Sequence, residues 1–238
     1  MKYMIITLIL CMQSDPYMNF ITLFPKAKYD EYGNYFTRKL STNSYVDLKE
    51  QFTLISDNQS FKFLCDEDSS SLFYKYDLYQ MEEGYLIEVV KEKYKHYAIS
   101  SFQRDNYDMV LYSKYDSENE RYYLKSFSKE GEKIDELLSN EIIYEGSSAG
   151  IDKFRFSIIS LDNIKTFTYD DVVNPNKKDK KTPLITKVVI EDYSIDSLGR
   201  FTKVAVDSIL LSQPVRAYTD FIGQPEGDDP ARRYWTLW

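Results

Sequence analysis

The sequence is poor in the residues on which many catalytic and metal centres depend. Its 238 residues include one histidine and two cysteines. A single histidine excludes a His-rich metal site, and any Ser–His or Cys–His mechanism would depend on His96 alone. Because only Cys65 lies outside the N-terminal stretch, a disulfide framework and a thiolate zinc site are also excluded. We therefore expect no metal and no cofactor.

Glycine and basic residues are scarce as well. The eight glycines are scattered singly, so the chain has no glycine-rich phosphate loop, and it has no nucleophile elbow. The net charge is −8, and such an acidic surface repels phosphates, which excludes nucleic acid as a partner. The one dense basic stretch, KKDKK at 177–181, is interpreted as a solvated loop.

Aromatic residues are abundant, with 22 tyrosines and 14 phenylalanines. Aromatic and β-branched side chains fit the half-buried surface of a sheet. From about residue 72 onward, short apolar runs alternate with brief polar joints; FRFSIIS at 154–160 alternates most clearly. Strands joined so closely must be antiparallel neighbours, because a parallel crossover needs about a dozen residues or more. We expect a mainly β (β-rich α+β) fold, a single antiparallel meander of about eight to ten strands.

One short amphipathic helix is expected ahead of the meander. Asp15 is suited to cap it and Pro16 to occupy its first position. The apolar residues Tyr17, Phe20, Ile21 and Phe24 follow at helical spacing, and Pro25 ends the run. Two shorter signals follow this helix. Gly33 with Asn34 predicts a turn entering a strand, and Ser56 with Gln59 predicts one or two helical turns that direct Cys65 into the core.

The domain boundaries follow from these patterns. Residues 15–211 form one β-rich domain, interrupted by a polar loop at 170–183. Residues 212–238 form a tail rich in proline and glycine that ends with both tryptophans, Trp235 and Trp238. Such a hydrophobic end either docks on its own fold or binds a partner.

Residues 1–14 are interpreted as a signal segment. Lys2 precedes an apolar run from Met4 to Met12, which is too short to span a bilayer. Cleavage before Asp15 would release the chain, whereas Cys11 is the candidate site for lipidation, although Leu10 departs from the small residue usual before a lipidated cysteine. The alternative is that the run is a buried strand of a cytoplasmic protein.

Carboxylates supply the remaining candidate chemistry. Pairs or groups occur at Asp66–Asp68, Glu82–Glu83, Asp170–Asp171 and Glu191–Asp192. Two carboxylates can perform glycoside hydrolysis, but neighbours on a strand point to opposite faces. Asp116, Glu118 and Glu120 alternate but lack the glycine and the later glutamate of an EF-hand loop. We expect His96 to be exposed on a strand edge, and the tyrosines to stabilise the sheet or, alternatively, to stack on a glycan.

Three stretches each have the order of a strand, a tight polar turn and another strand: YYLKSFSKEGEKIDELL, FRFSIISLDNIKTFTYD and VIEDYSIDSLGRFTKV. Together they resemble a group of small exported proteins and lipoproteins of Gram-negative bacteria that has no known activity. The matching residues are Phe127, Lys129, Gly131, Lys133, Ile134, Asp135, Leu137, Ile158, Asp162, Ile164, Tyr193, Ile195, Gly199 and Phe201. FKFLC at 61–65 and FITLFP at 20–25 are also similar, so the resemblance covers about 20–210. It implies a β-rich protein of the cell envelope and brings no functional residues.

These observations favour a non-enzymatic envelope or periplasmic protein that binds a protein or a glycan, with membrane contact only through a lipid anchor. Two alternatives remain. One is a carboxylate-dependent hydrolase in the same compartment, which requires two carboxylates converging in a cleft. The other is a cytoplasmic interaction or immunity-type protein whose acidic surface meets a basic target.

Overall fold

The computed structural model describes residues 15–37, 40, 51–65, 73–79, 86–115, 120–143, 153–173 and 184–212. Within these ranges the helical elements are α1 (Pro16–Ile21), α3 (Asp57–Gln59) and the π-helical turn η2 (Ser60–Leu64). The strands are β1 (Tyr35–Phe36), β2 (Thr53–Leu54), β3 (Phe73–Tyr79), β4 (Leu86–Lys93), β5 (Lys95–Gln103), β6 (Tyr107–Tyr115), β7 (Glu120–Ser128), β8 (Lys133–Ile143), β9 (Lys153–Ile159), β10 (Asn163–Val173), β11 (Leu184–Ile195) and β12 (Phe201–Leu211).

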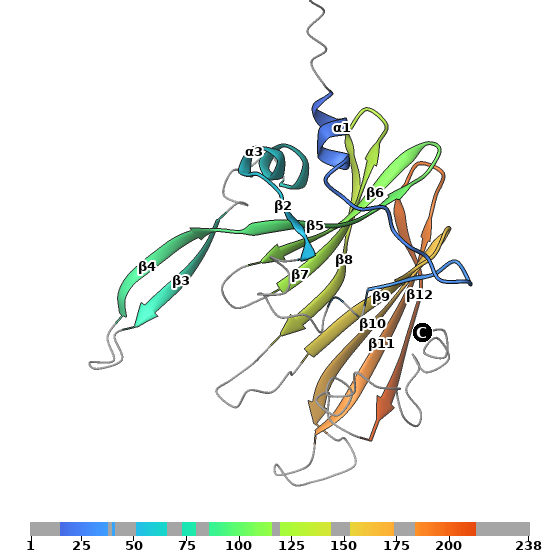
Figure 1. Cartoon of the computed structure of the whole chain (residues 1–238). Coiled ribbons are helices and arrows are strands. Elements are labelled where there is room, and N and C mark those ends of the chain that lie inside the picture. Colours follow the sequence, from blue (N-terminus) through green and yellow to red (C-terminus); the bar gives the residue numbers. More distant parts are fainter. Residues whose placement is uncertain are drawn as a thin grey trace, which may run out of the picture.

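Strands β5 to β12 form one antiparallel meander, which confirms the predicted fold class. From β5 to β12 every strand pairs with its successor in the chain, β2 pairs with β5, and β1 pairs with β9 (Figure 1). Strands β3 and β4 form a separate hairpin that extends away from the sheet at the start of β5 (Figure 1). Short joints enforce this order, because two strands linked by a tight turn can only pair antiparallel.

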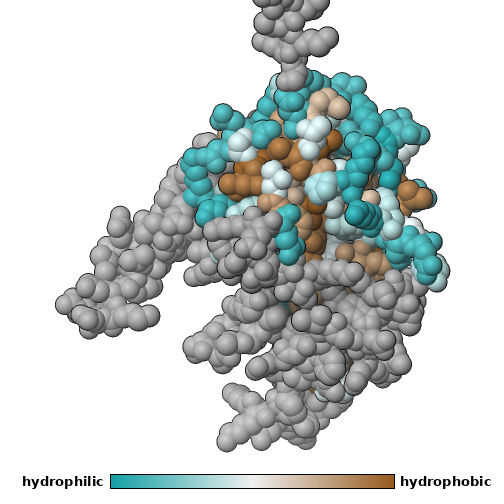
Figure 2. Space-filling view, in the orientation of Figure 1, coloured by the Kyte–Doolittle hydropathy of each residue, from teal (hydrophilic) through white to brown (hydrophobic). Residues whose placement is uncertain are grey.

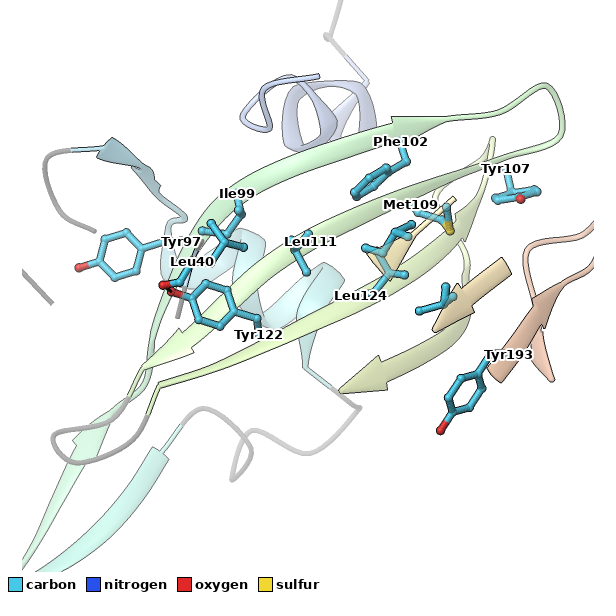
Figure 3. Packing of buried hydrophobic residues seen from close by; sticks show 12 residues of the cluster. Leu40, Tyr97, Ile99, Phe102, Tyr107, Met109, Leu111, Tyr122, Leu124 and Tyr193 are labelled. Carbon is cyan, nitrogen blue, oxygen red and sulfur yellow. Dashed lines mark hydrogen bonds between the residues drawn. The ribbon is translucent and has the colours of Figure 1, made fainter. Parts of the chain in front are cut away.

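The sheet curls, and its largest hydrophobic cluster lies inside the curl. Strand β8 pairs with β9 only along Glu141–Ile143, so the two halves of the sheet diverge beyond that point. The Phe201 N–H at the start of β12 donates to the Asp135 carboxylate near the start of β8 (2.7 Å). The enclosed core includes Tyr97, Ile99, Phe102, Met109, Leu111, Tyr122, Leu124 and Tyr193 (Figure 3).

A second cluster lies beneath α1 and η2 and confirms the predicted amphipathic helix. The Asp15 carboxylate accepts from the Tyr17 N–H (2.9 Å), and Pro16 occupies the first turn, as expected. Phe20 is fully buried and stacks on Phe63 of η2, with ring centroids 4.5 Å apart. The regular helix ends at Ile21, earlier than Pro25, but Phe24 still reaches the same core.

The segment around Ser56 also matches its prediction. The Ser56 hydroxyl caps α3, and the chain continues into η2, where the Cys65 N–H donates to the Ser60 carbonyl (2.9 Å). Cys65 is buried, as expected. Helical turns α3 and η2, together with α1, cover only part of this side of the sheet. Figure 2 shows apolar atoms at the surface between α1 and α3 within a hydrophilic border, which is common for folded proteins.

One predicted loop is partly wrong. Asp170 to Val173 belong to β10, where Asp170 lies opposite Lys187 and Val173 opposite Leu184 on β11. The polar pair Asp170–Asp171 suggested a loop, but pairing along the neighbouring strand continues past it. The remainder of the predicted loop, 174–183, lies outside the described residues, as do residues 1–14 and the tail from 213 onward.

Two glycines at turns, Gly131 between β7 and β8 and Gly33 just before β1, give a matched stability test. Gly131 (φ +88°) and Gly33 (φ +77°) both adopt the left-handed conformation, which costs other residues about 1–2 kcal/mol. A Cβ at Gly131 would lie 2.6 Å from the Tyr17 ring, whereas one at Gly33 would meet nothing within 4 Å. We expect Gly131→Ala to lower the free energy of unfolding by about 1–3 kcal/mol more than Gly33→Ala, because overpacking adds to the backbone strain. Urea denaturation of both variants measures this, and equal losses would contradict the close contact with Tyr17.

Candidate functional site

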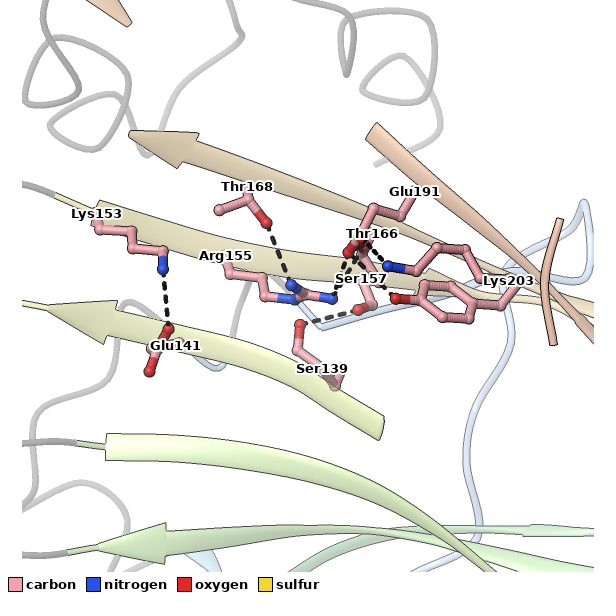
Figure 4. Close-up of polar contacts among 10 residues, drawn as sticks. Ser139, Glu141, Lys153, Arg155, Ser157, Thr166, Thr168, Glu191 and Lys203 are labelled. Atoms are coloured by element: carbon pink, nitrogen blue, oxygen red, sulfur yellow. Dashed lines mark hydrogen bonds and ion pairs between the residues drawn. The ribbon is translucent and has the colours of Figure 1, made fainter. Parts of the chain in front are cut away.

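A polar network occupies one face of β8 to β12, with Arg155 at its centre (Figure 4). The Arg155 guanidinium donates to the Glu191 carboxylate (3.0 Å) and to the hydroxyls of Thr166 (3.3 Å) and Thr168 (3.4 Å). The Tyr193 hydroxyl donates to the same Glu191 oxygen (3.2 Å), and Lys203 of β12 pairs with the other. The network therefore ties three central strands to the last strand of the sheet.

The groups around Glu191 hold its carboxylate in the ionised form. Burial alone would raise the pKa of Glu191, but the hydrogen bonds and charges of Lys203 and Arg155, with the Tyr193 hydroxyl, outweigh it and lower the pKa. Glu141, directly opposite Arg155 on β8, pairs with Arg121 (2.8 Å) and with Lys153 (3.8 Å). A carboxyl that must donate a proton in hydrolysis needs a raised pKa, the opposite of the shift at Glu191. The lowered pKa of Glu191 and the two ion pairs of Glu141 favour a structural role for both glutamates.

A second polar cluster lies under η2 and corrects the prediction for His96. His96 is 2% exposed, its ring centroid lies 5.9 Å from that of Tyr112, and the residue lies opposite Lys114 on β6. Burial, together with the charges of Lys114 and Lys125, lowers the pKa of His96 from 6.5 to about 3. The neighbouring lysines suggested an exposed strand edge, but the Ile55 N–H donates to the His96 carbonyl (2.8 Å), so the segment after β2 covers this position.

Lys125 is the most enclosed charge of this cluster. Its ammonium donates to the Leu64 carbonyl at the end of η2 (2.7 Å) and pairs with Glu136 (2.6 Å). The Tyr112 hydroxyl donates to the same Glu136 carboxylate (3.0 Å). Lys125 binds η2 directly, and Glu136 and Tyr112 hold Lys125 in place on the sheet. We therefore assign the cluster a structural role.

The other predicted site residues divide into two groups. Glu191 and Asp192 point to opposite faces, as expected: Glu191 joins the network, and Asp192 pairs with Lys165 of β10. Outside the residues whose side chains the structure describes lie Cys11, Asp66–Asp68, Glu82–Glu83, Asp116, Glu118, Glu120, the basic stretch 177–181, Trp235 and Trp238. Among the described side chains, no group of three or more histidines, cysteines or carboxylates is arranged to hold a metal ion.

The two edges of the sheet differ in whether other segments pair with their backbone groups. At the β5 edge, β2 pairs with Tyr97 and Ala98, and the Ser101 backbone exchanges hydrogen bonds with Pro25 and Ala27 (both 2.8 Å). Two short segments thus occupy backbone groups of β5 at residues 96–98 and at Ser101, which is a common way to block unwanted strand pairing. Among the described strands, β12 pairs only with β11 and forms the opposite edge.

Strand β12 is unusually exposed for its length. All residues from Thr202 to Ser208 are exposed, and they include Val204 (61%) and Val206 (60%); Leu210 (56%) follows. A bulge between β11 and β12 leaves Val204 without a partner residue, and Lys203 anchors the strand to Glu191. Beyond the bulge, Ala205 to Leu211 run regularly along β11. Edge strands present N–H and C=O groups that no neighbouring strand uses. On this stretch the Ser208 N–H donates to the exposed carboxylate of Asp207 (2.7 Å), a bond that a further strand would replace.

The pattern of FTKVAVDSIL predicted this strand but not its exposure. Val, Ala, Ile and Leu in close succession suggest a buried strand. The position of the strand at the end of the meander leaves Val204, Val206 and Leu210 exposed, whereas Ile209 still packs against the core. We take the regular stretch Ala205–Leu211, called the β12 edge below, as the candidate functional site.

No helix among the described residues combines the length and the apolar character needed to cross a membrane.

Comparison with known proteins assigns neither a family nor a function to this site. The chain matches no protein-family model, no curated protein and no solved structure.

Proposed function

We propose that this chain is a non-enzymatic binding module that holds an extended protein segment on the β12 edge. The observation that carries the proposal is the contrast between the two edges: β5 is covered by β2 and residues 25–27, whereas β12 is open among the described residues and bears exposed Val206 and Leu210. Strand addition supplies backbone hydrogen bonds for affinity, and side chains on alternate positions supply specificity.

A protein ligand is favoured over a glycan by the positions of the tyrosines. Glycan binding by stacking needs exposed ring faces. Most tyrosines whose side chains are described serve the core instead; buried are Tyr17, Tyr97, Tyr107, Tyr112, Tyr122, Tyr169 and Tyr193. The open edge, by contrast, offers backbone groups that a polypeptide matches along its whole length.

Site-specific photo-crosslinking in the native host tests this function. A photoreactive phenylalanine analogue at Val206 is expected to give adducts with protein, because a bound strand would lie within reach of that side chain. The matched control carries the same group at Leu161, which is 56% exposed but lies in the turn between β9 and β10. Adducts from Val206 but not from Leu161 support the proposal. Equal yields from both positions, no adduct, or adducts with polysaccharide alone overturn it.

We further propose that the module is exported by residues 1–14 and works in the periplasm or, through a lipid on Cys11, at the outer membrane. The order of charge, apolar run and polar QSDP supports export. The intact mass of the protein from membrane and soluble fractions tests this. A chain that starts at Cys11 with acyl mass, or at Asp15 without it, supports export by the corresponding route. A full-length chain in the cytoplasm overturns it and favours the cytoplasmic interaction partner.

A further inference from the structure

We infer that the partner strand is the β12 edge of a second copy of this chain, paired antiparallel about a two-fold axis at Ser208. This inference rests on the proposed function and names its partner. Closed two-fold symmetry is the commonest form of assembly for soluble proteins, and it requires a surface that complements itself. The β12 edge meets this requirement in one register only, as the positions of its side chains show.

The bulge at Val204 limits where pairing is possible. Regular pairing with a new strand requires an unbroken alternation of side chains, and the bulge interrupts it between Lys203 and Ala205. The regular stretch therefore has seven residues, Ala205 to Leu211. A two-fold axis at its middle residue, Ser208, uses the entire stretch in both copies.

The faces of β12 follow from its pairing with β11. Val206 lies opposite Glu191 and Leu210 opposite Lys187, while Ser208 lies opposite Val189. These three β12 residues share one face, since directly opposed residues of a sheet point to the same side. Asp207 and Ile209, which lie opposite the core residues Ile190 and Val188, share the other.

In the Ser208 register the opposed side chains are compatible. Val206 meets Leu210 of the second copy, twice by symmetry, and the small Ser208 meets itself at the axis. On the other face Asp207 meets Ile209, so no like charges are opposed. Shifting the axis by one residue to Asp207 opposes the two carboxylates directly, which is destabilising. Shifting it to Ile209 shortens the paired stretch and loses the contacts between valine and leucine.

The net charge of the chain determines how this pairing should depend on salt. Each copy carries −8, so two copies repel one another at long range. Salt screens exposed charges beyond about 10 Å at 0.1 M ionic strength. Homotypic pairing should therefore tighten as salt rises, whereas a basic partner attracted by the acidic surface would bind more weakly.

Cysteine substitution at the axis is the sharpest test. In the full chain with Cys11→Ser, Ser208→Cys is expected to form a disulfide dimer on mild oxidation, because opposed residues have Cα atoms about 4.5 or 5.5 Å apart. Thr202→Cys is the matched control, because it keeps Asp207, is exposed on the same strand beyond the bulge and lies six residues from the axis, so its copies are tens of ångströms apart at about 3.4 Å per residue. Cys65 is buried and remains in both variants.

Sedimentation equilibrium of the same full chain provides the reversible counterpart. Ser208→Lys opposes two ammonium groups at the axis and is expected to raise the dimer dissociation constant at least tenfold. Thr202→Lys, exposed on the same strand beyond the bulge, should change it less than twofold. A monomeric parent chain at all concentrations, or a dimer that does not crosslink through residue 208, overturns the inference. Adducts between Val206 and a different protein would still support the proposed function. Failure of pairing between two copies can therefore be distinguished from failure of the proposed function.

Discussion

Replacing Glu136 with alanine is expected to lower the free energy of unfolding by about 3–5 kcal/mol, the range observed when a buried ion pair loses one partner. The reason is the burial of Lys125, whose side chain is 4% exposed. Without Glu136 the ammonium keeps the Leu64 carbonyl but loses its only paired carboxylate among the described residues. The buried Tyr112 hydroxyl loses its acceptor at the same time.

Replacing Lys125 instead of Glu136 should lower the free energy of unfolding by much less. Lys125→Met removes the buried charge and fills most of its volume, while Glu136, 36% exposed, remains in contact with water. The Leu64 carbonyl then loses one hydrogen bond, which is worth about 1–2 kcal/mol. Urea denaturation of both variants at neutral pH, with unchanged m-values, measures the difference. Equal losses, or a smaller loss for Glu136→Ala, would show that the burial of Lys125 is not what makes this pair important.

Acidification is expected to destabilise the protein through its single histidine. In the folded chain the imidazole of His96 stays neutral, because burial lowers its pKa to about 3, whereas the unfolded chain binds a proton near 6.5. The stability contributed by the neutral imidazole is thus complete above pH 6.5. It falls by roughly 1.4 kcal/mol for each pH unit below that value until the folded pKa is reached.

Two measurements isolate this contribution. Carboxylates also titrate below pH 5, but their effects cancel in the difference between the parent and His96→Gln. The stability of the parent relative to this variant should therefore decline steadily from pH 6.5 to 4. In the folded parent, the imidazole resonances of the only histidine should show no titration near 6.5. A midpoint near 6.5 in the folded state would contradict the buried, neutral imidazole.

The meander could be predicted from the sequence because its determinants are local. Alternation in FRFSIIS, the short joints and the capping residues Asp15 and Pro16 each act within a few residues. The burial of His96 could not be predicted in this way, because it depends on Ile55 and η2, which approach from about 40 residues earlier in the chain. Strand β5 itself shows little alternation, since both of its faces are covered.

The candidate site was predicted only in part. Residues 201–210 were expected to form a strand, but nothing within them indicates that they form the last strand of the sheet. The carboxylates considered for hydrolysis illustrate the same limit. Glu191 acquires its partners Arg155 and Lys203 from two other strands, and no spacing in the sequence relates these three residues.

The pairing of Thr37 with Ser157 has a consequence for the order of folding. Their backbone and side-chain bonds join residues 120 positions apart, and the bond from Tyr17 to Asp108 spans 91. The hairpins β5–β6, β6–β7, β7–β8, β9–β10 and β11–β12 close loops of three to five residues and can form early. The N-terminal segment is synthesised first, yet it completes its contacts only after β9 has emerged. The apolar stripe of Tyr17, Phe20 and Phe24 packs on Phe63 and on Phe127 of β7. It therefore stays exposed on the nascent chain, where it favours aggregation, until β7 has emerged.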